Sequence, residues 1–198
     1  VNGIPLAVLE LKNPADEKAD TYTAYKQLET YKVQIPSLFM TNEVLITSDG
    51  VLARVGSLSA GWDRFVPWRT INGDDHHSAG ILELEILIKG LFEPRRFLDF
   101  ILNFVVFENR GKVVKKIAAY HQYWAVNKAI GCTFSACGIH ANADRLLGHF
   151  PAFDEPRLQG LKERKDLYIP RKFGDRRIGV IWHTQGSGKS LVMVWLAK

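Results

Sequence analysis

A glutamate and a lysine stand two positions apart in the first apolar run of the sequence, IPLAVLELKNP (residues 4–14). Successive side chains of a β-strand point to opposite faces, so Glu10 and Lys12 share one face, and we expect Leu9 and Leu11 to form a core on the other. A carboxylate that holds Mg²⁺, beside an ammonium that orients a water or stabilises charge on phosphorus, suits phosphodiester hydrolysis. The competing interpretation is an exposed ion pair without a catalytic role.

A glycine-rich loop near the other end of the sequence, HTQGSGKS (residues 183–190), has the spacing of a phosphate-binding loop. It follows an apolar run at 178–182, expected to be a strand, and precedes a helix expected to begin near Lys189. Lys189 would reach the β- and γ-phosphates of ATP, and the Ser190 hydroxyl would bind Mg²⁺. His183 replaces the first glycine of the pattern G-x-x-x-x-G-K-S/T, a departure typical of helicase-type motors of superfamily 2. Three backbone N–H groups can turn toward phosphate oxygens, those of Gly186, Ser187 and Gly188.

The elements that would position the first pair follow it directly in the sequence. Residues Ala15 to Val33 predict a helix with acidic residues in its first turn. Gln27 and Tyr31 lie four apart on this helix, so both could reach one site. Asp49-Gly50, between two apolar runs, predicts a two-residue hairpin. Residues 81–107 are strongly apolar with helical spacing.

The Glu10-Leu11-Lys12 strand, followed by a helix with Gln27-x-x-x-Tyr31, resembles the PD-(D/E)xK nuclease fold. The text around it is similar to the restriction (R) subunit of type I restriction-modification enzymes. The resemblance implies that Glu10 ligates a metal ion, that Lys12 is the catalytic lysine, and that Gln27 and Tyr31 form an accessory motif near the DNA. The family's first metal-binding Asp lies on the preceding strand, and residues 1–9 contain no Asp or Glu. A lone carboxylate is a poor Mg²⁺ site, so we expect the chain by itself to be inactive.

Two later segments extend the resemblance. Residues 91–108 are similar to the connecting region of R subunits, where they would pack the nuclease domain against the motor. Residues 116–130 (KIAAYHQYWAVNKAI) resemble the segment just before the motor. There Gln122 would match the adenine-reading glutamine of helicases, since a carboxamide both donates and accepts hydrogen bonds. A surface glutamine on an amphipathic helix is the alternative.

Composition limits the class of protein further. With 198 residues and 46% hydrophobic content the chain can bury a core, and a formal charge of +5 is compatible with a polyanionic partner without requiring one. Only Cys132 and Cys137 are present, which argues against a disulfide framework and for a reducing, cytoplasmic location. Zinc could be imagined with His140 and His149, but no second compact ligand pair is present, so we favour a solvent-exposed insertion at residues 131–173. No apolar stretch is long enough to span a bilayer.

We therefore expect an α/β chain in two parts, each truncated. Residues 1–107 would be a PD-(D/E)xK nuclease domain with connecting helices, a restriction-endonuclease-like mixed sheet flanked by helices. Residues 108–198 would begin a RecA-like parallel α/β ATPase domain. The resemblance implies a type I site-specific deoxyribonuclease that uses Mg²⁺ and ATP, translocates along double-stranded DNA, cleaves unmodified foreign DNA and works with methylation (M) and specificity (S) subunits. Another helicase-nuclease fusion, in DNA repair or phage defence, and a non-catalytic DNA-binding remnant are the alternatives.

Overall fold

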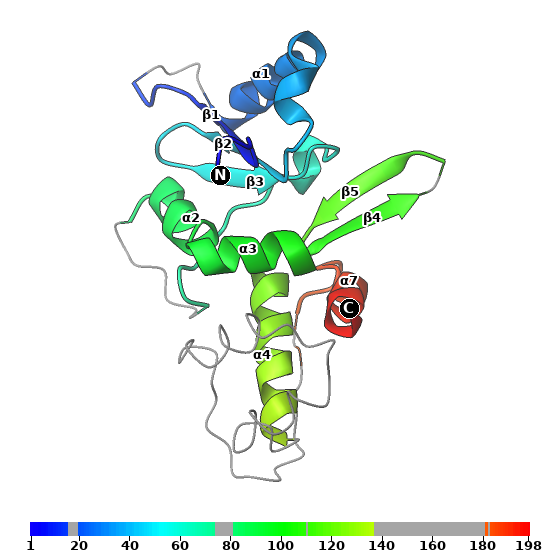
Figure 1. Ribbon diagram of the computed structural model, residues 1–198. Coiled ribbons are helices and arrows are strands. Elements are labelled where there is room, and N and C mark those ends of the chain that lie inside the picture. Colours follow the sequence, from blue (N-terminus) through cyan, green and yellow to red (C-terminus); the bar gives the residue numbers. More distant parts are fainter. Residues whose placement is uncertain (16–19, 74–80, 110, 137–180, 182) are drawn as a thin grey trace. The chain divides into compact units, whose positions relative to one another are not determined.

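The chain forms two compact units, Val1–Tyr120 and His121–Lys198. The computed structural model (Figure 1) describes residues 1–15, 20–73, 81–109, 111–136, 181 and 183–198. Within these residues the protein is a mixture of helices and small sheets, so the expected α/β class is confirmed at that level. The boundary expected after residue 107 falls inside a strand, Val105–Asn109, and the two units meet 13 residues later, after Tyr120.

A three-stranded mixed sheet carries the first motif. Its order is β1-β2-β3, with β1 parallel to β2 and β2 antiparallel to β3. A parallel pair needs a crossover connection, and here helix α1 supplies it and packs against β1 and β2 (Figure 1). The bounds of these elements are β1 Ala7–Leu11, α1 Thr21–Gln34, β2 Val44–Ser48 and β3 Ala53–Gly56. A 3₁₀ turn, Pro36–Phe39, lies between α1 and β2.

The face of β1 that packs inward is the one that carries the charged pair. Val8 packs against a core cluster made by Leu28 of α1, Leu45 of β2, and two aromatic residues, Phe39 and Phe65. Glu10 lies two residues beyond Val8 and therefore on the same face. The opposite face of β1 is open to solvent: Leu9 is 38% and Leu11 is 56% exposed. The expectation that Leu9 and Leu11 form the core face was wrong, because α1 and its aromatic neighbours cover the other side of the strand.

Helix α1 starts later than its sequence predicts. Asp20 has extended backbone angles and is the N-cap, and its carboxylate accepts hydrogen bonds from the Thr23 backbone N–H and hydroxyl, each 2.7 Å long. These two bonds lower the pKa of Asp20 below its ordinary value. The predicted start at Ala15 was wrong, since Asp20 supplies the helix with a strong cap at that point. Residues 16–19 lie outside the described part of the chain.

The turn between β2 and β3 is also longer than predicted. Ser48 pairs directly with Ala53, so four residues form the loop instead of two. The Asp49 carboxylate accepts hydrogen bonds from the Val51 and Leu52 backbone N–H groups, at 3.0 and 2.8 Å, and this favours the wider turn. Gly50 has a φ of 92°, which is the left-handed conformation that glycine adopts without strain.

The apolar segment after residue 80 forms two helices and then a strand. These elements are α2 Glu83–Leu91, α3 Pro94–Asn103 and β4 Val105–Asn109, with β4 paired antiparallel to β5 Val113–Ile117. The helical conformation predicted up to Phe107 was therefore wrong for residues 105–107, which belong to β4. Valines 105 and 106 are β-branched and find a partner strand in β5, and this pairing decides their conformation.

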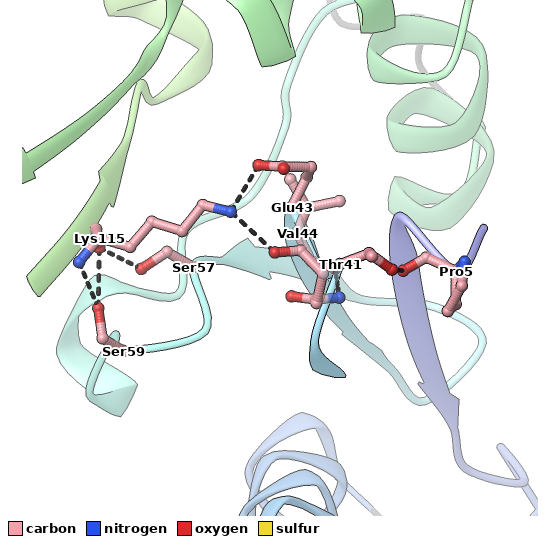
Figure 2. A network of polar contacts seen from close by, with 8 residues as sticks. Pro5, Thr41, Glu43, Val44, Ser57, Ser59 and Lys115 are labelled. Carbon is pink, nitrogen blue, oxygen red and sulfur yellow. Dashed lines mark hydrogen bonds and ion pairs between the residues drawn. The ribbon is translucent and has the colours of Figure 1, made fainter. Parts of the chain in front are cut away.

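A half-buried lysine, Lys115, links the β4–β5 ribbon to the segments beside β2 and β3, as Figure 2 shows. The Lys115 ammonium binds the Glu43 carboxylate and, at 2.8 Å, the Asn42 carbonyl. The hydroxyls of Ser57 and Ser59 donate to the Lys115 carbonyl at 2.6 and 3.0 Å. A two-stranded ribbon is only marginally stable by itself, so these contacts stabilise it against the ends of β2 and β3.

In the second unit the described elements are α4, Tyr120–Ala136, which begins with the last residue of the first unit, and α7, Lys189–Ala197. The helix expected near Lys189 is confirmed. The strand expected at 178–182 lies outside the described residues except for Ile181, so the RecA-like sheet stays a prediction. The insertion, with Cys137, His140 and His149, also lies outside them. Cys132 is a buried free thiol of α4. Among the described helices, none has the length and apolar character to cross a membrane.

Candidate functional site

The first candidate site is the charged pair of β1. The Lys12 ammonium lies 2.8 Å from Glu10 Oε1, and the two side chains are 20% and 16% exposed. The Lys12 backbone N–H donates to the Ser48 carbonyl at 2.8 Å, which continues the pairing with β2 one residue past the strand end and keeps Lys12 on the side of Glu10. The pair is therefore largely buried on the face that α1 covers, while a catalytic role for it stays a prediction.

A polar row runs across the sheet from this pair. Glu10 of β1 is in register with Thr47 of β2, and Thr47 is in register with Arg54 of β3. Residues in register on neighbouring strands point to the same face, so all three side chains lie on the α1 side. Thr47 is fully buried. The Arg54 guanidinium donates to the Phe65 carbonyl at 3.3 Å and lies 5.5 Å from the Trp62 ring centre.

The two predicted accessory residues lie on α1. Tyr31 packs against the core cluster, and Gln27 is half-buried one helical turn before it. Gln27 and Tyr31 lie on the same side of α1 as Ala24 and Leu28. Both of these residues are fully buried, and α1 packs against β1 and β2. The structure therefore places Gln27 and Tyr31 on the element that covers Glu10, while a direct role in chemistry stays a prediction.

The second candidate site is the phosphate-binding loop. Gly186 and Gly188 have φ angles of 80° and 78°, a conformation that other residues adopt only with strain. Gly188 is the N-cap of α7, so the positive end of the helix dipole faces the loop. The Lys189 ammonium donates to the carbonyls of His183 and Thr184 at 2.9 and 3.0 Å. The Lys189 ammonium therefore lies against the backbone of the loop, as is expected of a site that binds an anion.

Gln122 of α4 contacts the same loop. Its side-chain amide donates to the Ser187 carbonyl at 2.8 Å and approaches the Gly188 carbonyl at 3.4 Å. A Cβ on Gly188 would lie 2.4 Å from this amide nitrogen, so a side chain there would displace Gln122. Gln122 was predicted to read adenine, and that role stays a prediction. What the structure adds is that Gln122 holds the backbone of the loop.

Two histidines lie beside Lys189, a feature that sequence reasoning missed. The rings of His121 and His183 meet edge to face, with centres 5.0 Å apart. Burial lowers the pKa of His121, and burial together with His121 and Lys189 lowers the pKa of His183. Both shifts favour the neutral form of the imidazole rings. The sequence signal was the histidine at the first glycine position, but its partner 62 residues earlier could not be read from spacing.

Two parts of the chain match known protein families. Residues 1–64 match the family described as "Type I restriction enzyme R protein N terminus", and residues 121–198 match the SWI2/SNF2 ATPase family. The second match begins at the first residue of the second compact unit. The resemblance is thereby confirmed: the chain is similar to the N-terminal part of the R subunit of type I restriction enzymes.

The individual relatives agree with this class. Over its whole length the chain is 45% identical to the type I restriction enzyme HindI endonuclease subunit of Haemophilus influenzae. It is 28% identical to the putative type I restriction enzyme MjaIXP endonuclease subunit of Methanocaldococcus jannaschii, and 27% to the putative MjaVIIIP endonuclease subunit of the same organism. The chain spans 16% of the length of the first relative and 17% of the second.

Proposed function

We propose that this chain carries the nuclease site and the phosphate-binding loop of a type I restriction enzyme's R subunit, which hydrolyses ATP, translocates along double-stranded DNA in the cytoplasm and cleaves it when unmodified. The observation that carries the nuclease half is the half-buried Glu10–Lys12 pair on the covered face of β1. A rigid strand holds both groups in one orientation, which a catalytic pair needs.

The residues of β1 fit one side of a Mg²⁺ site. Glu10 supplies a carboxylate oxygen, and Mg²⁺ commonly uses one or two carboxylates and keeps several waters. When bound, the ion would polarise the phosphodiester. Lys12 would stabilise the negative charge that develops on the phosphate oxygens, and its ion pair with Glu10 fixes where the ammonium lies.

The loop residues fit the phosphates of ATP with Mg²⁺. Gly186, Ser187 and Gly188 would donate backbone N–H groups, Lys189 would exchange its two loop carbonyls for phosphate oxygens, and Ser190 would ligate the ion. The match of residues 121–198 to SWI2/SNF2 ATPases supports this assignment. We propose that M and S subunits assemble with the full-length protein and supply sequence recognition.

The test is Mg²⁺-dependent cleavage of unmethylated duplex DNA by the full-length subunit assembled with its M and S subunits, with and without ATP. Cleavage that requires ATP would join the two sites in one enzyme. Hydrolysis of ATP without cleavage would leave a translocase with a degenerate nuclease domain and would contradict the proposal.

A change at Gln122 tests how the loop is held. In Gln122→Glu a carboxylate would face the carbonyls of Ser187 and Gly188, so two acceptors would meet where a hydrogen bond now lies. We expect ATP binding to weaken by about tenfold or more, because a buried pairing becomes a repulsion. A fluorescent ATP analogue titrated into the full-length subunit measures this.

A comparison of ATP with GTP separates the two roles considered for Gln122, which are holding the loop and reading adenine. Met193→Gln, on the helix that follows the loop and 71% exposed, should leave binding unchanged. Equal losses for ATP and GTP indicate that Gln122 acts on the loop, whereas a loss confined to ATP would indicate adenine reading. Wild-type affinity in Gln122→Glu would contradict both roles.

A further inference from the structure

Thr47 presents a buried hydroxyl that has no hydrogen-bond partner in the part of the chain that the structure describes. The residue is 0% exposed, and its Oγ1 atom is completely covered. A buried hydroxyl without a partner destabilises the folded state, since it has lost its bonds to water. Valine has the same branched shape without the polar atom and would be the more stable choice at this position of a central strand.

The position of Thr47 indicates what the hydroxyl is for. It is in register with Glu10 on the neighbouring strand, and both side chains lie on the α1 side of the sheet. Neighbouring strands lie about 4.8 Å apart, so a change of rotamer or one bridging water brings a hydroxyl and a carboxylate into contact. Lys12 binds Oε1 of Glu10, and the carboxylate has further acceptor capacity on Oε2.

A second unsatisfied donor lies on the same row. The Arg54 Nε atom is also buried without a hydrogen-bond partner among the described residues, although Nη1 of the same guanidinium donates to the Phe65 carbonyl. The row therefore consists of the Glu10 carboxylate, the Thr47 hydroxyl and the Arg54 guanidinium. Thr47 Oγ1 and Arg54 Nε have no hydrogen-bond partner among the described residues. Buried donors without a partner are one place where a bound ion, or the waters that it orders, can supply the missing hydrogen bonds.

We propose that Thr47 is a positioning residue of the nuclease site: its hydroxyl donates to the Glu10 carboxylate, directly or through one water, and orients that carboxylate toward the metal ion. This inference rests on the proposed nuclease function. The proposed role of Thr47 is to orient the Glu10 carboxylate. Hydrogen bonds from neighbouring groups hold a metal-binding carboxylate in the rotamer that faces the ion. Lys12 holds one oxygen of Glu10, and Thr47, whose hydroxyl has no partner among the described residues, would hold the other once the ion is bound.

The test is Mn²⁺ binding by the full-length subunit without nucleotide, followed by electron paramagnetic resonance of the free ion. Glu10→Gln defines the component of binding that depends on Glu10. Thr47→Val is expected to raise the Kd of that component roughly tenfold, the effect of losing one hydrogen bond to a charged group. Thr47→Ser keeps the hydroxyl and should stay close to the wild-type Kd. In the assembled enzyme, Thr47→Val should raise the Mg²⁺ concentration needed for half-maximal cleavage by the same factor.

Stability measurements separate this role from simple packing. Thr47→Val should unfold at the same or a higher urea concentration than the wild type, because it removes an unsatisfied polar atom. Ile46→Val, on the same strand but the opposite face, should lose stability while its Mn²⁺ Kd stays unchanged.

Two results would overturn the inference about Thr47 alone: an unchanged Mn²⁺ Kd in Thr47→Val, or a Thr47→Ser variant as impaired as Thr47→Val. If Glu10→Gln itself leaves Mn²⁺ binding unchanged, Glu10 holds no metal ion. The proposed nuclease site then fails together with this inference.

Discussion

Lys189→Ala is expected to abolish both ATP hydrolysis and ATP-dependent DNA cleavage in the assembled enzyme. Lys189 is held at the loop by two carbonyl oxygens, of His183 and Thr184, and these are weak partners for an ammonium compared with phosphate. We expect the rate of ATP hydrolysis to fall by about 10²- to 10³-fold, as when one electrostatic contact to the transition state is removed.

The measurement is phosphate release with DNA present, with cleavage of the same DNA followed in parallel. Met193→Gln is the matched control, because Met193 lies on the same helix and is 71% exposed. It should retain both activities. Cleavage that persists in Lys189→Ala while ATP hydrolysis is lost would show that the nuclease works without the motor, contrary to the proposed coupling.

Lys12→Ala is expected to abolish cleavage and to leave DNA-stimulated ATP hydrolysis intact. The ammonium lies 2.8 Å from Glu10, and both side chains are more than three-quarters buried. The substitution removes the charge that would stabilise the phosphate in the transition state, so a loss of about 10²- to 10³-fold in cleavage rate is expected. It also leaves the Glu10 carboxylate without its ion-pair partner, which costs some stability.

A second ion pair provides the control for that stability cost. Lys116→Ala breaks the pair that Lys116 makes with Glu108 at 2.6 Å, where the side chains are 36% and 31% exposed. It should leave cleavage unchanged. Urea unfolding of both variants would separate a folding defect from a catalytic one. If Lys12→Ala cleaves DNA at the wild-type rate, the nuclease assignment is wrong and Glu10–Lys12 is an ordinary ion pair.

Several features of both sites could be predicted from short stretches of sequence, because their physical causes are local. The shared face of Glu10 and Lys12 follows from the two-residue period of a strand. The loop at residues 183–190 follows from glycines at positions that need left-handed backbone, together with a helix that begins at Lys189. Neither feature depends on what packs against it.

Other features were decided by the tertiary structure. Strand alternation shows which residues share a face, but it does not show which face is covered. The aromatic cluster around Phe65 and the return of α1 over β1 buried the Glu10 face and exposed Leu9 and Leu11. The turn at Asp49 widened because the Asp49 side chain caps backbone groups that spacing alone does not assign.

The partners of the site residues were decided in the same way. Thr47 and Arg54 enter the row of Glu10 through the register of three strands, and Gln122 meets Ser187 across 65 residues of sequence. Pairings of this kind are set by strand order, helix placement and burial over the whole unit. The sequence by itself therefore determined which chemical groups the protein has and their local geometry, and only the tertiary structure decided which of them meet, because contacts between distant segments depend on how the whole chain buries its apolar surface.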